Sequence, residues 1–264
     1  MNSHEIDYNI FGNDLQCVEI ELDPNETVIA EAGSMMMMDQ SIEMNTILGD
    51  GAVENEGIFK KVFAAGKRVL TGESLFMTTY TQNGHAKAKV TFAAPYPGKI
   101  IPMDLSALKG KIICQKEAFL CAAKGVSVGI EFQKRLGVGF FGGEGFIMQK
   151  LEGDGLAFLH AGGAVVKKTL NHEEVLNVDT GCLVALSSTV DYNIRLQKGI
   201  KNTLFGGEGL FIATLSGPGE VWIQSMPFSR LADRIYSRMP KQGGKRTGEG
   251  SILGGIGNLL DGDN

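Results

Sequence analysis

The sequence predicts an all-β fold built from three internal repeats of short strands. Three observations predict it: a high glycine content, short apolar runs bounded by turn residues, and one sequence phrase that occurs three times. Glycine accounts for 36 of the 264 residues, about twice its usual share, whereas there are only 7 prolines. Glycine without proline, and without a fixed triplet period, indicates many tight turns rather than a collagen-like chain.

The repeated phrase is a Gly-Glu pair followed by an apolar run. It reads GESLFM from Gly72, GEGFIM from Gly143 and GEGLFI from Gly207. A turn glycine follows each glutamate at a constant offset, and a second apolar run follows the turn. Two strands of fixed length joined by a turn require such an offset, so we expect a hairpin at this place in every repeat.

The repeats are expected at about 15–110, 111–173 and 174–228, each with five or six short strands. Turn-rich breaks at 94–98 and 170–174 agree with joints between repeats inside one fold. Because one repeat cannot bury a sheet face alone, we expect all three to pack about a common pseudo-threefold axis. Residues 1–228 are therefore predicted to form a single β domain.

One helix is expected at 229–240, after the repeats. Ser229 can cap a run in which Leu231, Ile235 and Met239 share one face, and Pro240 ends it. The remaining residues, 241–264, keep some helical spacing of leucine and isoleucine but contain several glycines, each costing about 1 kcal/mol relative to alanine. They are expected to form a flexible tail.

Bulk composition mainly excludes classes of protein. The formal net charge of −5 gives no global positive field for nucleic acid, and no apolar run reaches the 18 residues or so that span a bilayer. The first residues have no basic and apolar pattern of a secretory signal. The four cysteines show no paired spacing, which favours free thiols in a reducing compartment. We therefore expect a cytoplasmic protein.

No catalytic motif is present in the sequence. The run GVGFFG at 137–142 matches the dinucleotide pattern G-x-G-x-x-G formally, but a strand-like run follows it where a helix would be needed. The four histidines are isolated in the sequence, which favours surface or hydrogen-bonded histidines over metal ligands. No catalytic residue, metal or other cofactor is expected, and the chain is predicted not to be an enzyme.

Two further features leave alternatives open. The glutamates of the repeated phrase, Glu73, Glu144 and Glu208, could form a carboxylate ring for a hard cation, or each could accept backbone N–H bonds within its own turn. The four consecutive methionines at 35–38 could offer an adaptable partner contact, or could form a strand buried on both faces.

Several of these phrases resemble the AIM24 family, whose eukaryotic members are called mitochondrial biogenesis proteins. The resemblance rests on EAGSM at 31–35, AFLCA at 118–122 and the three Gly-Glu turns, and it covers about 15–230. It implies a fold like that of the tryptophan-RNA-binding attenuation protein (TRAP), with short strands of double-stranded β-helix type. Mitochondrial relatives are associated with the inner membrane, and bacterial relatives have no established activity. The resemblance therefore implies a fold and no catalytic residue.

The strongest functional signal is a basic and apolar segment before each Gly-Glu turn. The three segments lie between Ile58 and Leu70, between Phe132 and Phe141, and between Arg195 and Phe205. Eight basic residues lie in these segments without an intervening acid, which leaves 17 basic and 30 acidic residues for the rest of the chain. Such segments suit an anionic membrane or an acidic partner, unless their apolar residues pack beneath the fold. The candidate contact residues are Phe59, Lys60, Lys61, Phe63, Lys67, Arg68, Lys134, Arg135, Phe140, Phe141, Lys198, Lys201 and Phe205.

The leading hypothesis is a non-enzymatic, homo-oligomeric scaffold that binds peripherally to an anionic membrane, on its cytoplasmic face, or to a membrane-associated protein. An RNA-binding module is the alternative implied by the TRAP-like resemblance, although the acidic composition disfavours nucleic acid. A small-ligand or metal-binding protein is a third hypothesis, supported by the three glutamates alone.

Overall fold

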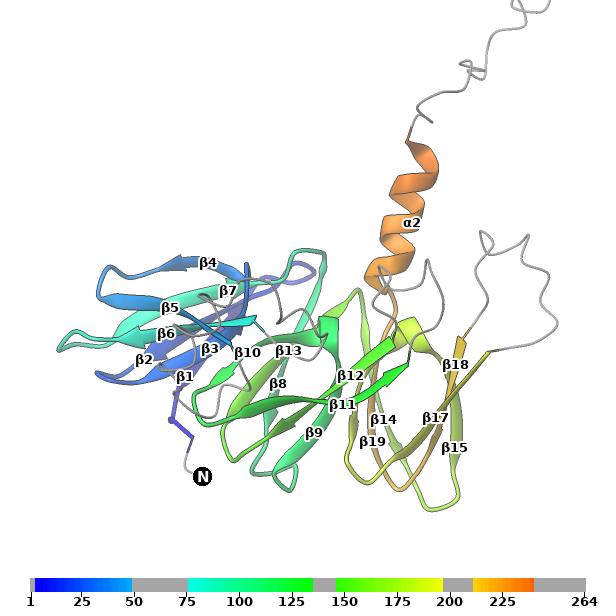
Figure 1. Ribbon diagram of the computed structural model, residues 1–264. Helices are drawn as coiled ribbons and strands as arrows, with labels where there is room; N and C mark the ends of the chain where they lie inside the picture. Colours follow the sequence, from blue (N-terminus) through cyan, green and yellow to red (C-terminus); the bar gives the residue numbers. More distant parts are fainter. Residues whose placement is uncertain (1–2, 49–75, 135–145, 197–210, 240–264) are drawn as a thin grey trace, which may run out of the picture. The chain divides into compact units, whose positions relative to one another are not determined.

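The computed structural model describes residues 3–48, 76–134, 146–196 and 211–239. In these ranges, nineteen strands pair antiparallel in four sheets, and one α-helix follows them (Figure 1). The all-β prediction with a short C-terminal helix is confirmed. The chain divides into two compact units, Met1–Arg230 and Leu231–Asn264, and all the strands belong to the first.

The strands fall into three consecutive groups of six that share one pattern of pairing. In each group the sixth strand lies between the first and the third, and the fifth lies between the second and the fourth. The first group is β2 (Cys17–Leu22), β3 (Thr27–Glu31), β4 (Met35–Met38), β5 (Ile42–Leu48), β6 (Phe76–Gln82) and β7 (Ala88–Ala93). The second is β8 (Gly98–Asp104), β9 (Lys111–Gln115), β10 (Phe119–Ala123), β11 (Ser127–Lys134), β12 (Phe146–Glu152) and β13 (Leu156–Gly162). The third is β14 (Val165–Leu170), β15 (Val175–Asp179), β16 (Leu183–Ser187), β17 (Asp191–Leu196), β18 (Phe211–Ser216) and β19 (Gly219–Gln224).

Consecutive groups are joined by one strand pair each. The second strand of one group pairs with the third strand of the next, as β3 with β10 and β9 with β16. We call these pairs the first and the second joint. Each joint fuses two three-stranded halves into a six-stranded sheet, β5-β6-β3-β10-β13-β8 and β11-β12-β9-β16-β19-β14. An additional strand, β1 (Asp7–Phe11), pairs with β2 at the start of the chain.

The hairpin prediction was wrong by one strand. The strands on either side of Gly84, Gly155 and Gly219 do not pair with each other; they belong to different sheets. The hairpins are β5–β6, β11–β12 and β17–β18, whose connections carry the Gly-Glu phrases. A turn at constant offset indicates two strands of fixed length, but it does not say whether the second strand folds back beside the first or crosses to another sheet.

The pairing also groups the strands differently from the expected repeat boundaries at 110 and 173. β8 pairs with β13, and β14 pairs with β19, so each of these strands belongs with the group that follows it. Along the sequence, the boundaries between the groups therefore lie near 94–97 and 163–164. The arrangement of the groups about a pseudo-threefold axis stays a prediction.

A β-bulge recurs at the same place in the third strand of every group. The register shifts between Met35 and Met37 in β4, between Phe119 and Cys121 in β10, and between Leu183 and Ala185 in β16. A bulge that recurs in one position is a structural feature rather than an irregularity. It sets the residue-by-residue correspondence between the groups.

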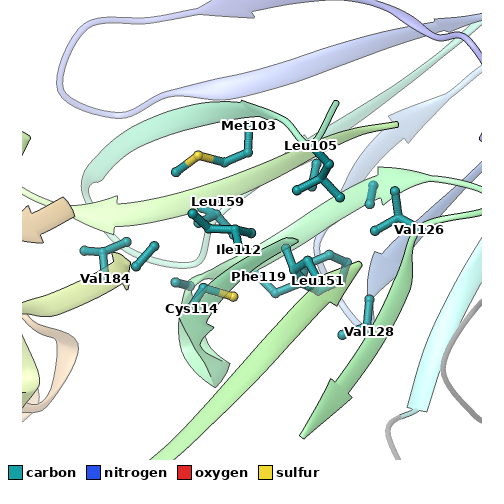
Figure 2. Close-up of a cluster of buried hydrophobic side chains, with 14 of the residues drawn as sticks. Met103, Leu105, Ile112, Cys114, Phe119, Val126, Val128, Leu151, Leu159 and Val184 are labelled. Carbon is teal, nitrogen blue, oxygen red and sulfur yellow. The ribbon is translucent and has the colours of Figure 1, made fainter. Parts of the chain in front are cut away.

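The core lies between the sheets, and its central cluster surrounds the two joints. Figure 2 shows residues of this cluster, including Met103, Ile112, Cys114, Phe119 and Leu151. β10 is buried along its whole length, as expected for an interior strand covered on both faces. By contrast, β2 alternates buried and half-buried residues, so one of its faces meets solvent.

The helix α2 spans Phe228–Arg238, close to the expected 229–240, and starts one residue before Ser229. Ile235 and Met239, two of the three residues expected on its apolar face, are 57% and 59% exposed. Leu231 is half-buried. The predicted helix is therefore confirmed, but Ser229 lies inside it instead of capping it, and its apolar residues remain largely open to solvent.

Candidate functional site

The three basic and apolar segments of the sequence connect the strands of the three hairpins. The last register pairs before them are Leu48 with Phe76 in the first group, Lys134 with Phe146 in the second, and Leu196 with Phe211 in the third. All three segments therefore join strands at equivalent positions of the pairing pattern. Sequence reasoning correctly assigned the segments to corresponding places in the three groups.

Of the thirteen candidate contact residues, the structure places one. Lys134 is the last residue of β11. The others lie outside the described residues: Phe59, Lys60, Lys61, Phe63, Lys67, Arg68, Arg135, Phe140, Phe141, Lys198, Lys201 and Phe205. The glutamates Glu73, Glu144 and Glu208 lie outside them too. Within the described ranges, no three His, Cys, Asp or Glu side chains gather closely enough to hold a metal ion.

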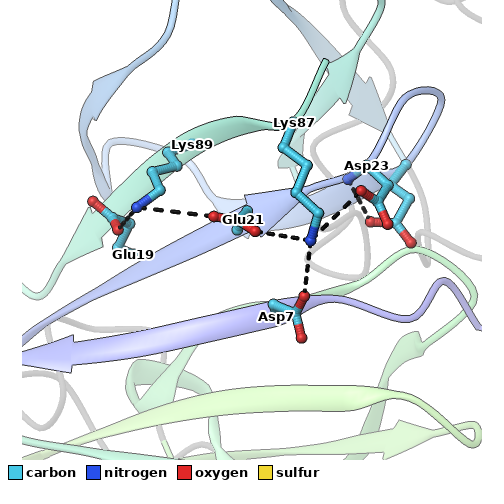
Figure 3. A network of polar contacts seen from close by, with 7 residues as sticks. Asp7, Glu19, Glu21, Asp23, Lys87 and Lys89 are labelled. Atoms are coloured by element: carbon cyan, nitrogen blue, oxygen red, sulfur yellow. Dashed lines mark hydrogen bonds and ion pairs between the residues drawn. The ribbon is translucent and has the colours of Figure 1, made fainter. Parts of the chain in front are cut away.

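Several lysines on or beside the described strands have acidic partners. On the outer face of β2 and β7, Lys87 contacts Asp7 and Glu21 at 3.3 and 2.9 Å, and Lys89 contacts Glu19 at 2.7 Å (Figure 3). The hydrogen bonds that the two lysines donate to these carboxylates raise the pKa of both lysines. Such solvent-exposed pairs contribute little to stability, but they neutralise the charge of the sheet surface locally.

The four-methionine strand β4 is exposed. Met36, Met37 and Met38 have 56%, 51% and 37% of their surface accessible, and Met35 is half-buried. The expectation of a strand buried on both faces was therefore wrong, and the alternative of an adaptable contact remains. β4 is the last strand of its sheet, β1-β2-β7-β4.

A cluster of titratable side chains, of which His160 is buried and Glu31 and Tyr96 are half-buried, lies at the first joint, and sequence reasoning missed it. Glu31 ends β3 and is half-buried, and this burial raises the pKa of its carboxyl to about 7. The charges of Lys116 and Glu117, in the 3-10 turn η1 (Lys116–Ala118), act on the same group. Burial, together with the charges of Glu117 and Glu31, also raises the pKa of Tyr96.

His160 on β13 belongs to this cluster. It is 3% exposed, and its ring meets that of Tyr96 edge-on at 4.4 Å between centroids. Neither ring nitrogen has a hydrogen-bond partner of normal geometry in the described structure. Burial lowers the pKa of His160 to about 4, although the nearby backbone of Tyr96 opposes the shift. The expectation of surface or hydrogen-bonded histidines was therefore wrong at this position.

The other described histidines agree better with expectation. Nδ1 of His4 accepts a hydrogen bond from the backbone N–H of Thr27 at 2.8 Å, and His85 and His172 are exposed. Only the apolar run around His160 could have indicated its burial from sequence. An isolated histidine within such a run is more readily interpreted as a hydrogen-bonded core residue, so the missing partners were not foreseeable.

The second joint has neutral amides at the corresponding positions. Gln115 ends β9 as Glu31 ends β3, and its Nε2 donates to the carbonyl oxygen of Thr180 at 3.2 Å. Gln224 corresponds to His160; it accepts from the backbone N–H of Gly162 at 2.7 Å and donates to the carbonyl oxygen of Gly181 at 2.8 Å. The two joints thus share a backbone arrangement but differ in ionisable groups.

Comparison with known proteins identifies the family of this chain. A family model described as Mitochondrial biogenesis AIM24 matches residues 8–226. The chain belongs to the AIM24 family. A relative from Streptococcus pyogenes serotype M6, the uncharacterized protein M6_Spy0233, is 31% identical over 225 residues, which cover 84% of this chain and 86% of the relative. The predicted family resemblance is confirmed.

A solved structure supports the same fold. The crystal structure of protein SPYM3_0169 from Streptococcus pyogenes matches with a TM-score of 0.66 at 23% identity, covering 89% of this chain and 100% of that one. This similarity supports the AIM24-type fold alone. Across the residues described for the AIM24 chain, no helix has the length and apolarity needed to cross a membrane.

Proposed function

We propose that this AIM24 protein is a non-enzymatic oligomeric scaffold that binds peripherally to anionic membrane surfaces through the three segments carried by its hairpins. The observation that supports the proposal most is the equivalence of the hairpins β5–β6, β11–β12 and β17–β18. Three binding segments carried by one chain would act together, so that weak contacts combine into avidity.

The distribution of charge supports the same proposal. The segments contribute eight basic residues with no acid among them, whereas sheet lysines such as Lys87, Lys111 and Lys150 pair with carboxylates. An unpaired lysine near an anionic lipid surface contributes about 1 kcal/mol to binding. Phenylalanines in the same segments would add apolar contact with the interface between headgroups and acyl chains.

Liposome co-sedimentation of the full chain tests this proposal. We expect binding to vesicles containing phosphatidylglycerol, weakening with added salt, and little binding to phosphatidylcholine alone. The double variant Lys61→Glu/Lys201→Glu should bind the anionic vesicles about tenfold more weakly or worse, because two attractive charges become repulsive. The matched control is Lys109→Glu/Lys168→Glu, which changes net charge equally on exposed positions of the described fold and should bind nearly as wild type.

Equal binding by the two double variants, or no preference for anionic vesicles, would overturn the proposal. A filter-binding arm with pooled RNA separates the alternative. If RNA binds more tightly than the vesicles do, and the segment variant alone loses it, the RNA-binding hypothesis replaces membrane docking.

A further inference from the structure

Two strands of this fold have an open edge where their counterparts are paired. In the pairing pattern, the second and third strands of a group form the joints: β3 with β10, and β9 with β16. The third strand of the first group is β4, and the second strand of the third group is β15. Among the described strands, β4 pairs with β7 alone and β15 pairs with β18 alone.

The other strands at sheet edges are different. The fourth strands β5, β11 and β17 end their sheets in every group, and so do the first strands β8 and β14. Their open edges are therefore part of the pattern. Apart from β8 and β14, whose counterpart β2 pairs with the additional strand β1, only β4 and β15 of the described strands lack a neighbour that their counterparts in the other groups possess.

The two open edges match the two sides of an existing joint. Through the shared bulge, Met37 corresponds to Cys121 and Ala185, which face Ala30 and Cys114 across the joints. β15 corresponds to β9, because it pairs with β18 as β9 pairs with β12 and is followed by the 3-10 turn η3 (Thr180–Cys182). In this correspondence, Val178 takes the place of Cys114. A β15·β4 pair in the same register would place Met37 opposite Val178, Met38 opposite Asn177 and Asp39 opposite Leu176.

The exposed residues of β4 and β15 favour pairing of these edges with another chain, because they lack the features that usually prevent such pairing. Edge strands are commonly shielded by lysine, proline or inward-pointing charges, because open backbone groups pair with other chains. β4 presents three exposed methionines instead, and Val175 of β15 is 59% exposed. Unbranched thioether side chains adapt to an opposing surface, so they suit a contact made after folding.

We infer that β15 of one copy pairs antiparallel with β4 of a second copy, reproducing the joint between chains. The inference specifies the self-association included in the proposed function and does not depend on membrane binding. Because the two edges differ, the contact is heterologous and head-to-tail. An assembly that has not closed into a ring therefore keeps one open β4 at one end and one open β15 at the other. Backbone hydrogen bonds would hold the pair together, as in β-strand addition to a sheet edge.

The mass of the full chain in solution tests this interface. Light scattering of the wild type should show assemblies larger than a monomer, and the Met37→Lys variant should need about tenfold higher concentration to assemble, or more. Met44→Lys is the matched control, because Met44 is 50% exposed against 51% for Met37 and lies on the edge strand β5. It should assemble as wild type. Both variants must show a cooperative urea unfolding transition, which shows that each is folded.

Disulfide trapping tests the register. Mixing separately purified Met38→Cys and Asn177→Cys chains under mild oxidation should yield a cross-linked dimer that neither variant forms alone. Asn177→Cys mixed with Glu43→Cys, on the β5 edge, should not cross-link. A monomeric wild type, equal effects of Met37→Lys and Met44→Lys, or a link formed within one chain of a Met38→Cys/Asn177→Cys double variant would each overturn the inference. Vesicle binding that survives in Met37→Lys would show that assembly and membrane docking are separate properties.

Discussion

The two joints of this fold share one backbone arrangement and differ in their ionisable groups. At the first joint the strand β3 ends in Glu31, and His160 lies on β13, which pairs with the other strand of the joint, β10. At the second joint, Gln115 and Gln224 occupy the corresponding positions and make hydrogen bonds to backbone groups. Strand pairing therefore does not require these particular side chains. What they change is whether the joint responds to protons.

The chemistry at each position explains the difference. At the second joint, Gln224 accepts a hydrogen bond from the backbone N–H of Gly162. At the first joint, the residue in the position of Gly162 is Pro95, and proline has no backbone N–H that could bond to His160. Gln115 donates an N–H to a carbonyl oxygen, and Glu31 can act as a donor only when it is protonated. The amides of the second joint keep these hydrogen bonds without titrating, whereas Glu31 and His160 at the first joint are titratable groups.

The largest effect is expected from making the second joint resemble the first. Gln115→Glu removes the amide that donates to the carbonyl oxygen of Thr180 and places a carboxylate beside this oxygen. The site is buried, because Gln115 is only 6% exposed. At pH 8 the substitution should lower the free energy of unfolding by roughly 3 kcal/mol, and by less at pH 5, where the carboxyl takes up a proton. Urea titrations at both pH values measure this, and an unchanged midpoint at pH 8 would contradict it.

A smaller effect of opposite sign is expected from making the first joint resemble the second. The pKa of Glu31 is raised from 4.5 to about 7, so the folded state binds its proton more tightly than the unfolded state. This contribution to stability is complete below pH 4.5 and is lost as pH rises through 7. Glu31→Gln should therefore raise the free energy of unfolding by roughly 2 kcal/mol at pH 8 and change it little at pH 4.5.

The control for Glu31→Gln is the same substitution at Glu26, a half-buried residue whose carboxylate caps the turn at Asp23. Glu26→Gln should not stabilise the protein at pH 8. If Glu31→Gln leaves the slope of stability against pH unchanged between 4.5 and 7, the first joint is not proton-sensitive through this residue.

The smallest effect is expected at His160. Its pKa is lowered from 6.5 to about 4, so its neutral form stabilises the fold above pH 6.5, and that contribution is lost as pH falls through 4. His160→Gln should cost about 1 kcal/mol at pH 8, because the contact with Tyr96 is reduced and Pro95 offers no N–H. The difference from wild type should shrink or reverse at pH 4.5. A constant difference across that range, in thermal or urea unfolding, would rule out titration of His160.

Part of the candidate site could be predicted from the sequence, and particular residues show why. The Gly-Glu phrase and the basic residues around Lys60, Lys134 and Lys198 are local patterns, so comparison of the chain with itself found them and placed them at corresponding positions. The exposure of Met36 to Met38 could not be found this way, because an apolar strand looks the same whether it is interior or at an edge. The titratable cluster was missed for a related reason: Glu31, Tyr96 and His160 are far apart in the sequence, and only the β3-β10-β13 pairing brings their elements together.

The sequence by itself determined the strand content, the threefold recurrence of its phrases and the family, because turn glycines, apolar runs and repeated motifs act over a few residues. Only the tertiary structure decided which strands pair. A strand such as β7 or β13 follows a tight turn yet pairs with strands far away in the sequence, since an extended chain can satisfy its backbone hydrogen bonds with any partner of matching edge. For the same reason the open edges of β4 and β15 emerge only from the completed pairing pattern.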